Sequence, residues 1–527
     1  MTAKNKATVK KTANSPTKNK VAEHPTKGDS KRYVKTVSGG KASLPTGNSV
    51  SSAKNKSKNA KKSGSAGNAK YTKISKPVKT VKVEPVDSRK TVYLLAGGER
   101  EPAVNQRYWA SFVEMEGLLN KAFKSVGFSL VRAHPYKPSE KHGFVASQKE
   151  GLDLFSNLDP EAPVLVVEST CRYSNHLLPG LLLHRGPILT CARWIGKTPS
   201  IAGMLNLNDG LGKAGKPFSS LWSVDFSDKW FLERLEKWLK TGVLKHSTSH
   251  LTALKRQAVT STNRILGEKL AAELRAGKAI LGVFHDGDTG TYNTILPDES
   301  LFGLGIFKER LSLAELYYEA GRITDEEARD VYRWIMAKGM TFHLGENEET
   351  DLTLRQILPQ CKVYIAVLRL ADRYGCTAIG IQGVQGLKYL LPAVDLAEGI
   401  LGNTERPPIK APGSSRYFFE GRPFLHFYAG DEPAALDALL TRRVAAALEQ
   451  PLETTQMQIR WGDTDPTETV DGFVWTFQSA AVPPAWFEGG WKAAESVRRP
   501  IDFFPLGGGT LRGVCRRGEI VWSRIFV

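Results

Sequence analysis

The chain has 527 residues, 41% of them hydrophobic, which is ordinary for a protein of roughly two to four globular domains. No run of about 18 uninterrupted apolar residues occurs, so no membrane span is expected, and the N-terminus lacks the apolar segment of a secretory signal. Five cysteines are scattered without a C-x-x-C pair, which favours a reducing, cytoplasmic compartment.

The net charge of +19 comes entirely from the N-terminal tail. Residues 1–90 contain 23 Lys and Arg against 4 Asp and Glu, whereas residues 91–527 contain 50 of each kind. We expect the tail to be disordered, because it consists mainly of Lys, Ser, Thr, Asn, Gly and Ala and has too little apolar surface to form a core. Such a polycation can bind nucleic acid or another polyanion; the alternative is a solubilising extension without a partner.

Residues 91–250 alternate between short apolar runs and amphipathic stretches. Strands are predicted at 91–96, 162–168, 187–191 and 221–226, and helices at 108–126 and 229–244. This alternation is typical of a parallel sheet covered by helices, so we predict a first Rossmann-like α/β domain at 91–250.

A second Rossmann-like α/β domain is predicted at 251–445. Its strands are expected at 279–284, 377–381 and 423–428, and its helices around 269–275, 324–338, 350–373 and 395–401. Thr324 and Glu327 have the spacing of a capping box at the start of one of these helices.

After residue 444 the pattern changes to alternating strands. Strands are expected at 470–477 and 519–526, and Gly507, Gly508 and Gly509 predict a turn. We therefore predict a β-rich domain at 446–527.

Residues 380–401 carry a spaced set of residues. They are Gly380, Gln382, Pro392, Asp395, Glu398 and Leu401. This pattern resembles the L-fucose and L-arabinose isomerases, metal-dependent enzymes that interconvert an aldose and its ketose, and the resemblance covers most of residues 91–527. It implies two α/β domains followed by an antiparallel, barrel-like β domain, which would be truncated here. It also implies a monosaccharide substrate and a homo-oligomer with sites where subunits meet.

The resemblance assigns residues to the sugar. Gln382, Gln385 and Lys388 follow the strand at 377–381 and are expected to hold sugar hydroxyls, and Arg100 lies where the family has a sugar-contacting arginine. A surface arginine is the alternative for Arg100. His426 lies in an apolar run and is expected to be a core histidine.

The resemblance also implies a Mn²⁺ site formed by a Glu, an Asp and a His. The Glu position falls on Ala429, the Asp position falls on Gln458, and the His would lie beyond the last residue of this sequence. Asp431 is then the best remaining ligand or base, because it faces the same side of an extended strand as Ala429. Asp463 and Asp465 are poorer candidates, and a solvated strand end is the alternative for all three acids. Mn²⁺ binding is therefore expected to be weak or absent.

Two functions remain open. The first is aldose–ketose isomerisation through an enediolate, at an active site that we expect to be degenerate in this chain because its ligand positions have changed. The second is a non-catalytic sugar-binding or scaffold protein whose basic tail binds nucleic acid or another polyanion.

Overall fold

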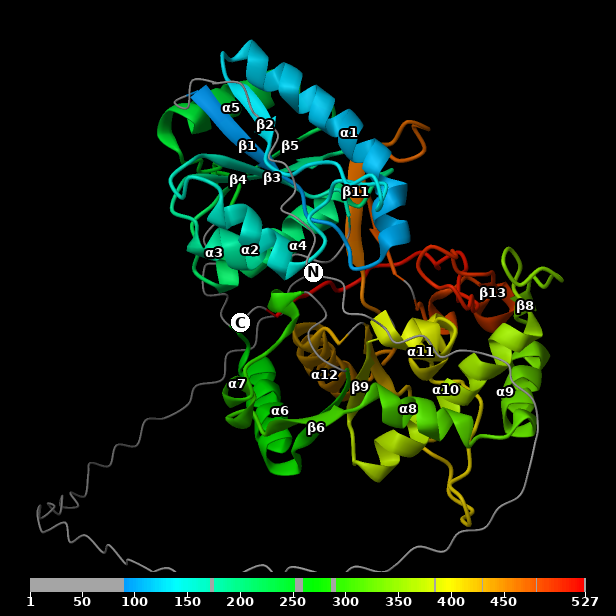
Figure 1. Ribbon diagram of the computed structural model, residues 1–527. Helices are drawn as coiled ribbons and strands as arrows, with labels where there is room; N and C mark the ends of the chain where they lie inside the picture. The colour runs from blue at the N-terminus through cyan, green and yellow to red at the C-terminus, as the bar shows by residue number, and fades with distance from the viewer. Residues whose placement is uncertain are drawn as a thin grey trace, which may run out of the picture. The chain divides into compact units, whose positions relative to one another are not determined.

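The computed structural model describes residues 90–170, 175–251, 259–285, 291–382, 385–428, 430–479 and 481–525 (Figure 1). All of them belong to one unit, Val81–Val527, and the domain boundaries predicted within it stay predictions. The predicted disorder of residues 1–89 and the position of Ala429 lie outside the described residues.

The first sheet has five parallel strands in the order β2-β1-β3-β4-β5. The strands are β1 (Thr91–Leu95), β2 (Ser129–Arg132), β3 (Val164–Val167), β4 (Ile188–Arg193) and β5 (Ser219–Ser223). The helices between and after them are α1 (Pro102–Ser125), α2 (Gln148–Ser156), α3 (Leu178–Leu183), α4 (Ser200–Lys213) and α5 (Lys229–Thr241). The α/β class with a parallel sheet is thus confirmed for this part of the chain.

Helices cover both faces of this sheet because successive strand residues point to opposite sides. Val92 and Leu94 of β1 pack in a core with α1 and α5, whereas Leu95 packs in a second core with α3 and α4. Helix α5 illustrates the local rules: Asp228 accepts a hydrogen bond from the Phe231 amide at its start, and its apolar stripe is buried against the sheet.

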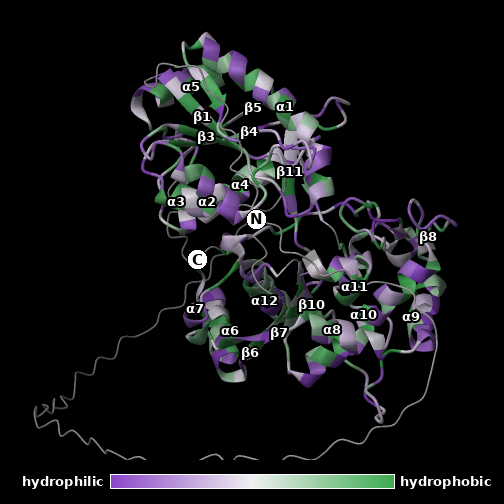
Figure 2. Cartoon of the chain, in the orientation of Figure 1, coloured by the Kyte–Doolittle hydropathy of each residue, from purple (hydrophilic) through white to green (hydrophobic). Residues whose placement is uncertain are grey.

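The second sheet has four parallel strands in the order β10-β9-β6-β7. The strands are β6 (Ala279–Phe284), β7 (Ile306–Leu311), β9 (Ala378–Ile381) and β10 (Leu425–Tyr428). The helices are α6 (Ser261–Gly277), α7 (Glu299–Phe302), α8 (Leu313–Gly321), α9 (Asp325–Ala337), α10 (Leu354–Arg373), α11 (Asp395–Leu401) and α12 (Glu432–Ala447). One face packs on α8 to α11 and the other on α6, α7 and α12; the central strands of both sheets are largely apolar, whereas the edge strand β7 carries three charged residues (Figure 2).

The C-terminal part contains antiparallel structure. Strand β11 (Gln458–Thr464) pairs with β12 (Phe473–Gln478), and β13 (Glu495–Ser496) pairs in parallel with β8 (Thr341–Phe342). The prediction of a strand at 519–526 is wrong for the residues that the structure describes. Residues 519–525 pair with no other strand and expose side chains such as Val521. The barrel-like arrangement stays a prediction. Within the described ranges, no helix combines the length and apolarity needed to cross a bilayer.

Candidate functional site

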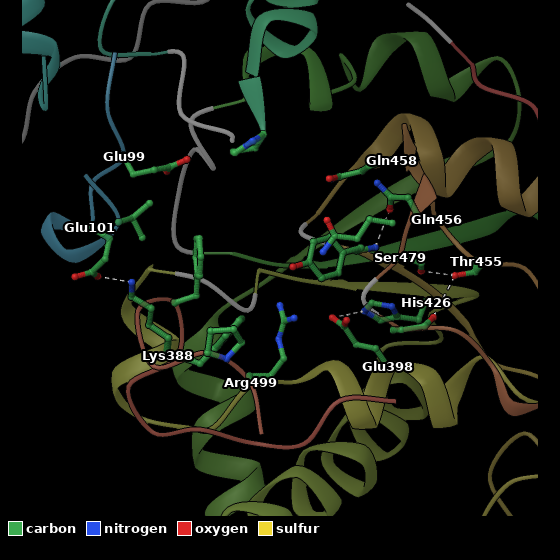
Figure 3. Close-up of a pocket in the computed structure, with 18 of the residues that line it drawn as sticks. Glu99, Glu101, Lys388, Glu398, His426, Thr455, Gln456, Gln458, Ser479 and Arg499 are labelled. Atoms are coloured by element: carbon green, nitrogen blue, oxygen red, sulfur yellow. Dashed lines mark hydrogen bonds and ion pairs between the residues drawn. The ribbon is translucent and has the colours of Figure 1, made fainter. Parts of the chain in front are cut away.

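A pocket of about 570 Å³ opens beyond the carboxyl ends of β9 and β10 (Figure 3). Four parts of the chain line it: the loop after β1 with the start of α1, Pro199 before α4, the segments around β9 and β10, and residues 454–504. Ligands of open α/β sheets bind at this edge, because the loops that follow parallel strands converge there. The walls combine charged groups and amides with the rings of Tyr108, Tyr428 and Phe503.

A buried carboxylate and a histidine face each other in the wall of this pocket. Glu398 comes from α11, a helix whose residues are all buried, and His426 comes from β10. His426 Nε2 lies 3.1 Å from Glu398 Oε1, and the two side chains are 6% and 0% exposed (Figure 3). The angles at this contact are not those of a hydrogen bond, and neither oxygen of Glu398 accepts a hydrogen bond from the described residues. A buried carboxylate without donors is costly, which marks the pair as a candidate for ligand chemistry.

Arg499 enters the pocket from the C-terminal part. Its Nε lies 3.4 Å from Asp395 Oδ2, and its guanidinium lies 4.9 Å from the centre of the Phe504 ring. The Arg499 amide donates to the Gly508 carbonyl at 2.9 Å. Gln360 of α10 holds the neighbouring turn, donating to the Gly509 carbonyl at 3.0 Å and accepting from the Gly509 amide at 2.8 Å.

The turn lies slightly earlier than predicted: residues 505–506 form it, the Gly507 amide donates to the Phe504 carbonyl at 2.9 Å, and Gly509 pairs with Arg498 in an antiparallel bridge. Gly507 and Gly508 have φ of +71° and +103°, and a Cβ on Gly509 would lie 2.2 Å from Ser496 Oγ. The turn fixes the backbone from which Arg499 extends.

The loop after β1 forms the opposite wall. The Asn105 side chain accepts from the Glu99 amide at 2.7 Å and donates to the Glu99 carbonyl at 2.8 Å, which fixes the loop against α1. Glu101 then reaches across to the second sheet, where Lys388 forms an ion pair with it and the Tyr389 hydroxyl donates to it at 2.5 Å. This contact joins the loops that follow β1 and β9.

Charge coupling in this wall changes two pKa values. Burial raises the pKa of Glu101, but the hydrogen bonds from Lys388 and Tyr389 outweigh burial and hold it below its usual value. The hydrogen bond to Glu101, together with burial, raises the pKa of Tyr389 to about 12. Glu101 is thus held as a carboxylate, and Tyr389 keeps its proton.

A second carboxyl lies buried at the end of β3. Glu168 is 3% exposed, and burial, followed by the negative charge of Glu99, raises its pKa well above the usual value. Glu168 therefore favours its protonated form, next to a carboxylate that lines the pocket.

Asp431, the predicted base or metal ligand, does not line the pocket. It is the N-cap of α12, where Oδ1 accepts from the Ala434 amide at 3.1 Å. Its Oδ2 accepts from Arg524 at 2.7 Å and from Gln456 Nε2 at 3.0 Å. Gln456 does line the pocket, and its other amide atom accepts from the Tyr428 amide at 3.1 Å, so Asp431 positions the pocket wall. A direct chemical role for Asp431 stays a prediction.

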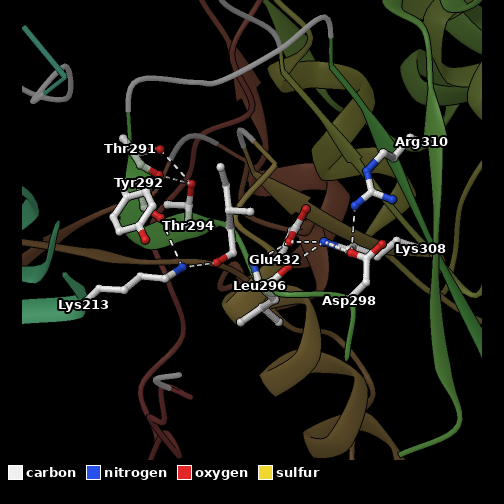
Figure 4. A network of polar contacts seen from close by, with 10 residues as sticks. Lys213, Thr291, Tyr292, Thr294, Leu296, Asp298, Lys308, Arg310 and Glu432 are labelled. Carbon is white, nitrogen blue, oxygen red and sulfur yellow. Dashed lines mark hydrogen bonds and ion pairs between the residues drawn. The ribbon is translucent and has the colours of Figure 1, made fainter. Parts of the chain in front are cut away.

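The neighbouring Glu432 belongs to a separate polar network (Figure 4). It accepts from the Leu296 amide at 2.6 Å and from the buried Lys308 at 3.0 Å, and Lys308 also contacts Asp298 at 2.7 Å. Lys213 of α4 donates to the Tyr292 carbonyl at 3.2 Å beside this network. The network thus anchors the start of α12 and the segment before α7, and Glu432 is paired with a cation.

Only some of the other predicted residues line the pocket. Lys388, Arg100 and Gln458 line it, whereas Gln382 is buried just beyond β9 and does not. The Gln385 side chain lies outside the described residues. The poorer acid candidates fall on β11 and in the turn after it: Asp463 is exposed, and Asp465 is half-buried and accepts hydrogen bonds from the turn itself.

His426, expected in the core, is almost fully buried but borders the pocket. The pair it forms with Glu398 had a sequence signal, namely an acid among apolar residues of a short helix and a histidine inside an apolar strand. Arg499 had no such signal, because a turn far along the chain positions it.

The described residues contain no group of three His, Cys, Asp or Glu side chains that could hold a metal ion. Glu398 and His426 supply two such donors, and Gln458 lines the same pocket with a neutral amide. Comparison with protein families and with curated proteins finds no match for this sequence.

Proposed function

We propose that the pocket binds a monosaccharide and interconverts its aldose and ketose forms, with Glu398 and His426 as the proton-transfer pair. The supporting observation is the buried Glu398 carboxylate, without a hydrogen-bond donor and 3.1 Å from His426 Nε2, in the wall of a pocket. Amides and aromatic rings elsewhere in the wall suit the hydroxyls and apolar faces of a sugar.

The chemistry assigned to these residues moves two protons. The Glu398 carboxylate takes the proton from C2 of the open-chain aldose and returns it to C1, while the hydroxyl proton of C2 passes to the carbonyl oxygen at C1. We assign to His426 the exchange of the hydroxyl proton between those two oxygens. Both side chains lie in the pocket wall, as a proton-transfer pair requires.

A divalent ion such as Mn²⁺ fits this site in part. Glu398 and His426 offer the oxygen and nitrogen donors that such ions accept, and the amide of Gln458 is a weaker third donor. A bound ion would polarise the two sugar oxygens. With one charged ligand, we expect it to be held weakly.

The Rossmann-like grouping of both sheets belongs to the same proposal. In the first sheet, the strands that follow β1 in sequence are added on opposite sides of it, so the direction of strand addition reverses between β1 and β3. In the second sheet, the same reversal lies between β6 and β9. Doubly wound sheets bind ligands at such reversals, and loops following β1 and β9 line this pocket.

The test is solvent hydrogen exchange into sugars. The full chain is incubated in D₂O with L-fucose, D-arabinose or L-arabinose, with and without Mn²⁺, and NMR follows deuterium at C1 and C2 and the appearance of ketose. Glu398→Gln should lower turnover by roughly 10²- to 10⁴-fold without preventing sugar binding. Glu420→Gln, an exposed matched change, should not. Binding without exchange in the unmodified chain would favour the non-catalytic alternative, and absence of binding would refute the proposal.

A further inference from the structure

The charged groups of the pocket are not those of a site for a neutral sugar alone. Among its described lining residues are four permanent cations, Arg100, Lys388, Arg460 and Arg499. Lys388 is committed to Glu101. Arg499 differs from it, because its guanidinium donates no hydrogen bond within the described part of the chain, and its Nε is buried without an acceptor.

Arg499 is nevertheless held in place. Phe504 lies against its guanidinium at 4.9 Å, and the carboxylate of Asp395 lies 3.4 Å from its Nε. In Figure 3 its side chain points into the pocket, between Lys388 and Glu398. A guanidinium fixed along one side presents its terminal N–H groups as a fork, the geometry that binds a carboxylate or a phosphate through two parallel hydrogen bonds.

Asp395 gives Arg499 a counter-charge but not the missing hydrogen bonds. A purely structural ion pair would bring the two groups to hydrogen-bond geometry, whereas here they lie 3.4 Å apart without it. The donors of a partly buried guanidinium need acceptors, and an anionic ligand supplies them at the pocket side.

We propose that the pocket binds an acidic sugar. Arg499 binds the carboxylate or phosphate of this sugar, and the other end of the sugar molecule reaches Glu398 and His426. This inference rests on the proposed sugar site and narrows its substrate class. A neutral sugar would offer Arg499 hydroxyls only, which are weaker acceptors than an anion.

The test compares three matched ligands on the full chain by calorimetry: D-glucose, D-glucuronate and D-glucose 6-phosphate. We expect one of the two anionic sugars to bind at least about 10-fold more tightly than glucose, and which one identifies the group as carboxylate or phosphate. Arg499→Met should abolish that preference, and Arg499→Lys should keep only part of it, because an ammonium lacks the fork. Arg517→Met, at an exposed position, should keep all of it.

The ratio of anionic to neutral binding separates recognition from structure, because loss of folding would weaken all three ligands together. Equal binding of glucose and both anionic sugars would overturn the acidic-sugar inference and leave the sugar site standing. A preference that survives in both Arg499 variants would overturn the role of Arg499. If none of the three ligands binds, the acidic-sugar inference is refuted, and the exchange test with L-fucose, D-arabinose and L-arabinose decides separately whether the sugar site stands.

Discussion

Acid should destabilise the first sheet through one buried histidine. His134 is 4% exposed, and its Nε2 accepts a hydrogen bond from the Ala96 amide at 3.0 Å, just where β1 leads into the pocket loop. Burial, and then the charges of Arg132 and Lys137, lower the pKa of His134 from 6.5 to about 3. Because the folded pKa is depressed, the neutral ring stabilises the protein fully above pH 6.5, and this contribution is lost as the pH falls from 6.5 towards 3.

The size of the effect follows from linkage. Each pH unit in this window removes about 1.4 kcal/mol from the free energy of unfolding, and the whole window about 5 kcal/mol. The variant is His134→Gln, whose amide oxygen can accept the Ala96 N–H but does not titrate. Urea unfolding of the unmodified protein and the variant at about pH 7, 6 and 5 gives the difference between their free energies of unfolding at each pH.

We expect that difference to shift in favour of the variant by about 1.4 kcal/mol for each pH unit below 6.5. His176 and Glu168 also have shifted pKa values, but they are present in both proteins and cancel. His250→Gln removes an exposed imidazole and is the matched control. A difference that stays constant from pH 7 to 5 would show that His134 is not held neutral.

Two further predictions concern the pocket walls. Glu101→Gln removes the charged acceptor that raises the pKa of Tyr389 to about 12, so this pKa should fall towards 10 in an ultraviolet absorbance titration. Gly508→Ala should destabilise the chain by at least about 2 kcal/mol in urea unfolding, because φ is +103° and a Cβ would lie 2.8 Å from the Ala393 amide nitrogen. The matched Gly212→Ala, with open space in α4, should instead stabilise it by up to about 1 kcal/mol.

Strands buried on both faces could be predicted from the sequence, because they are continuous apolar runs. The runs at 91–96, 162–168 and 279–284 correspond to β1, β3 and β6. Strand β7 could not be predicted: it lies at the edge of its sheet, and only its first and last residues are buried. The run at 519–526 shows the converse error, because alternation predicts an extended chain but cannot supply a partner strand.

The site was less predictable, because one residue type serves several purposes. Asp431 follows a strand and precedes a helix, a position that suits a ligand-binding acid and a helix N-cap equally well, and the structure uses it as a cap. Glu398 and His426 are 28 positions apart, and their approach depends on how α11 packs against β10. Sequence spacing does not encode that packing.

The two proposals depend on different parts of the chain, which makes them separable. Glu398 and His426 belong to α11 and β10, whereas the backbone of Arg499 is held by Gly508 in the C-terminal part, although its ion-pair partner Asp395 also lies on α11. Glu398→Gln should therefore abolish exchange at C2 but keep the preference for an acidic sugar, and Arg499→Met should do the reverse at saturating ligand. In the double variant each substitution should have about the same effect as it has alone, and a departure from this would measure coupling through α11, which carries both Glu398 and Asp395. Loss of the anion preference in Glu398→Gln would instead mean that the carboxylate and the arginine act on the ligand as one unit.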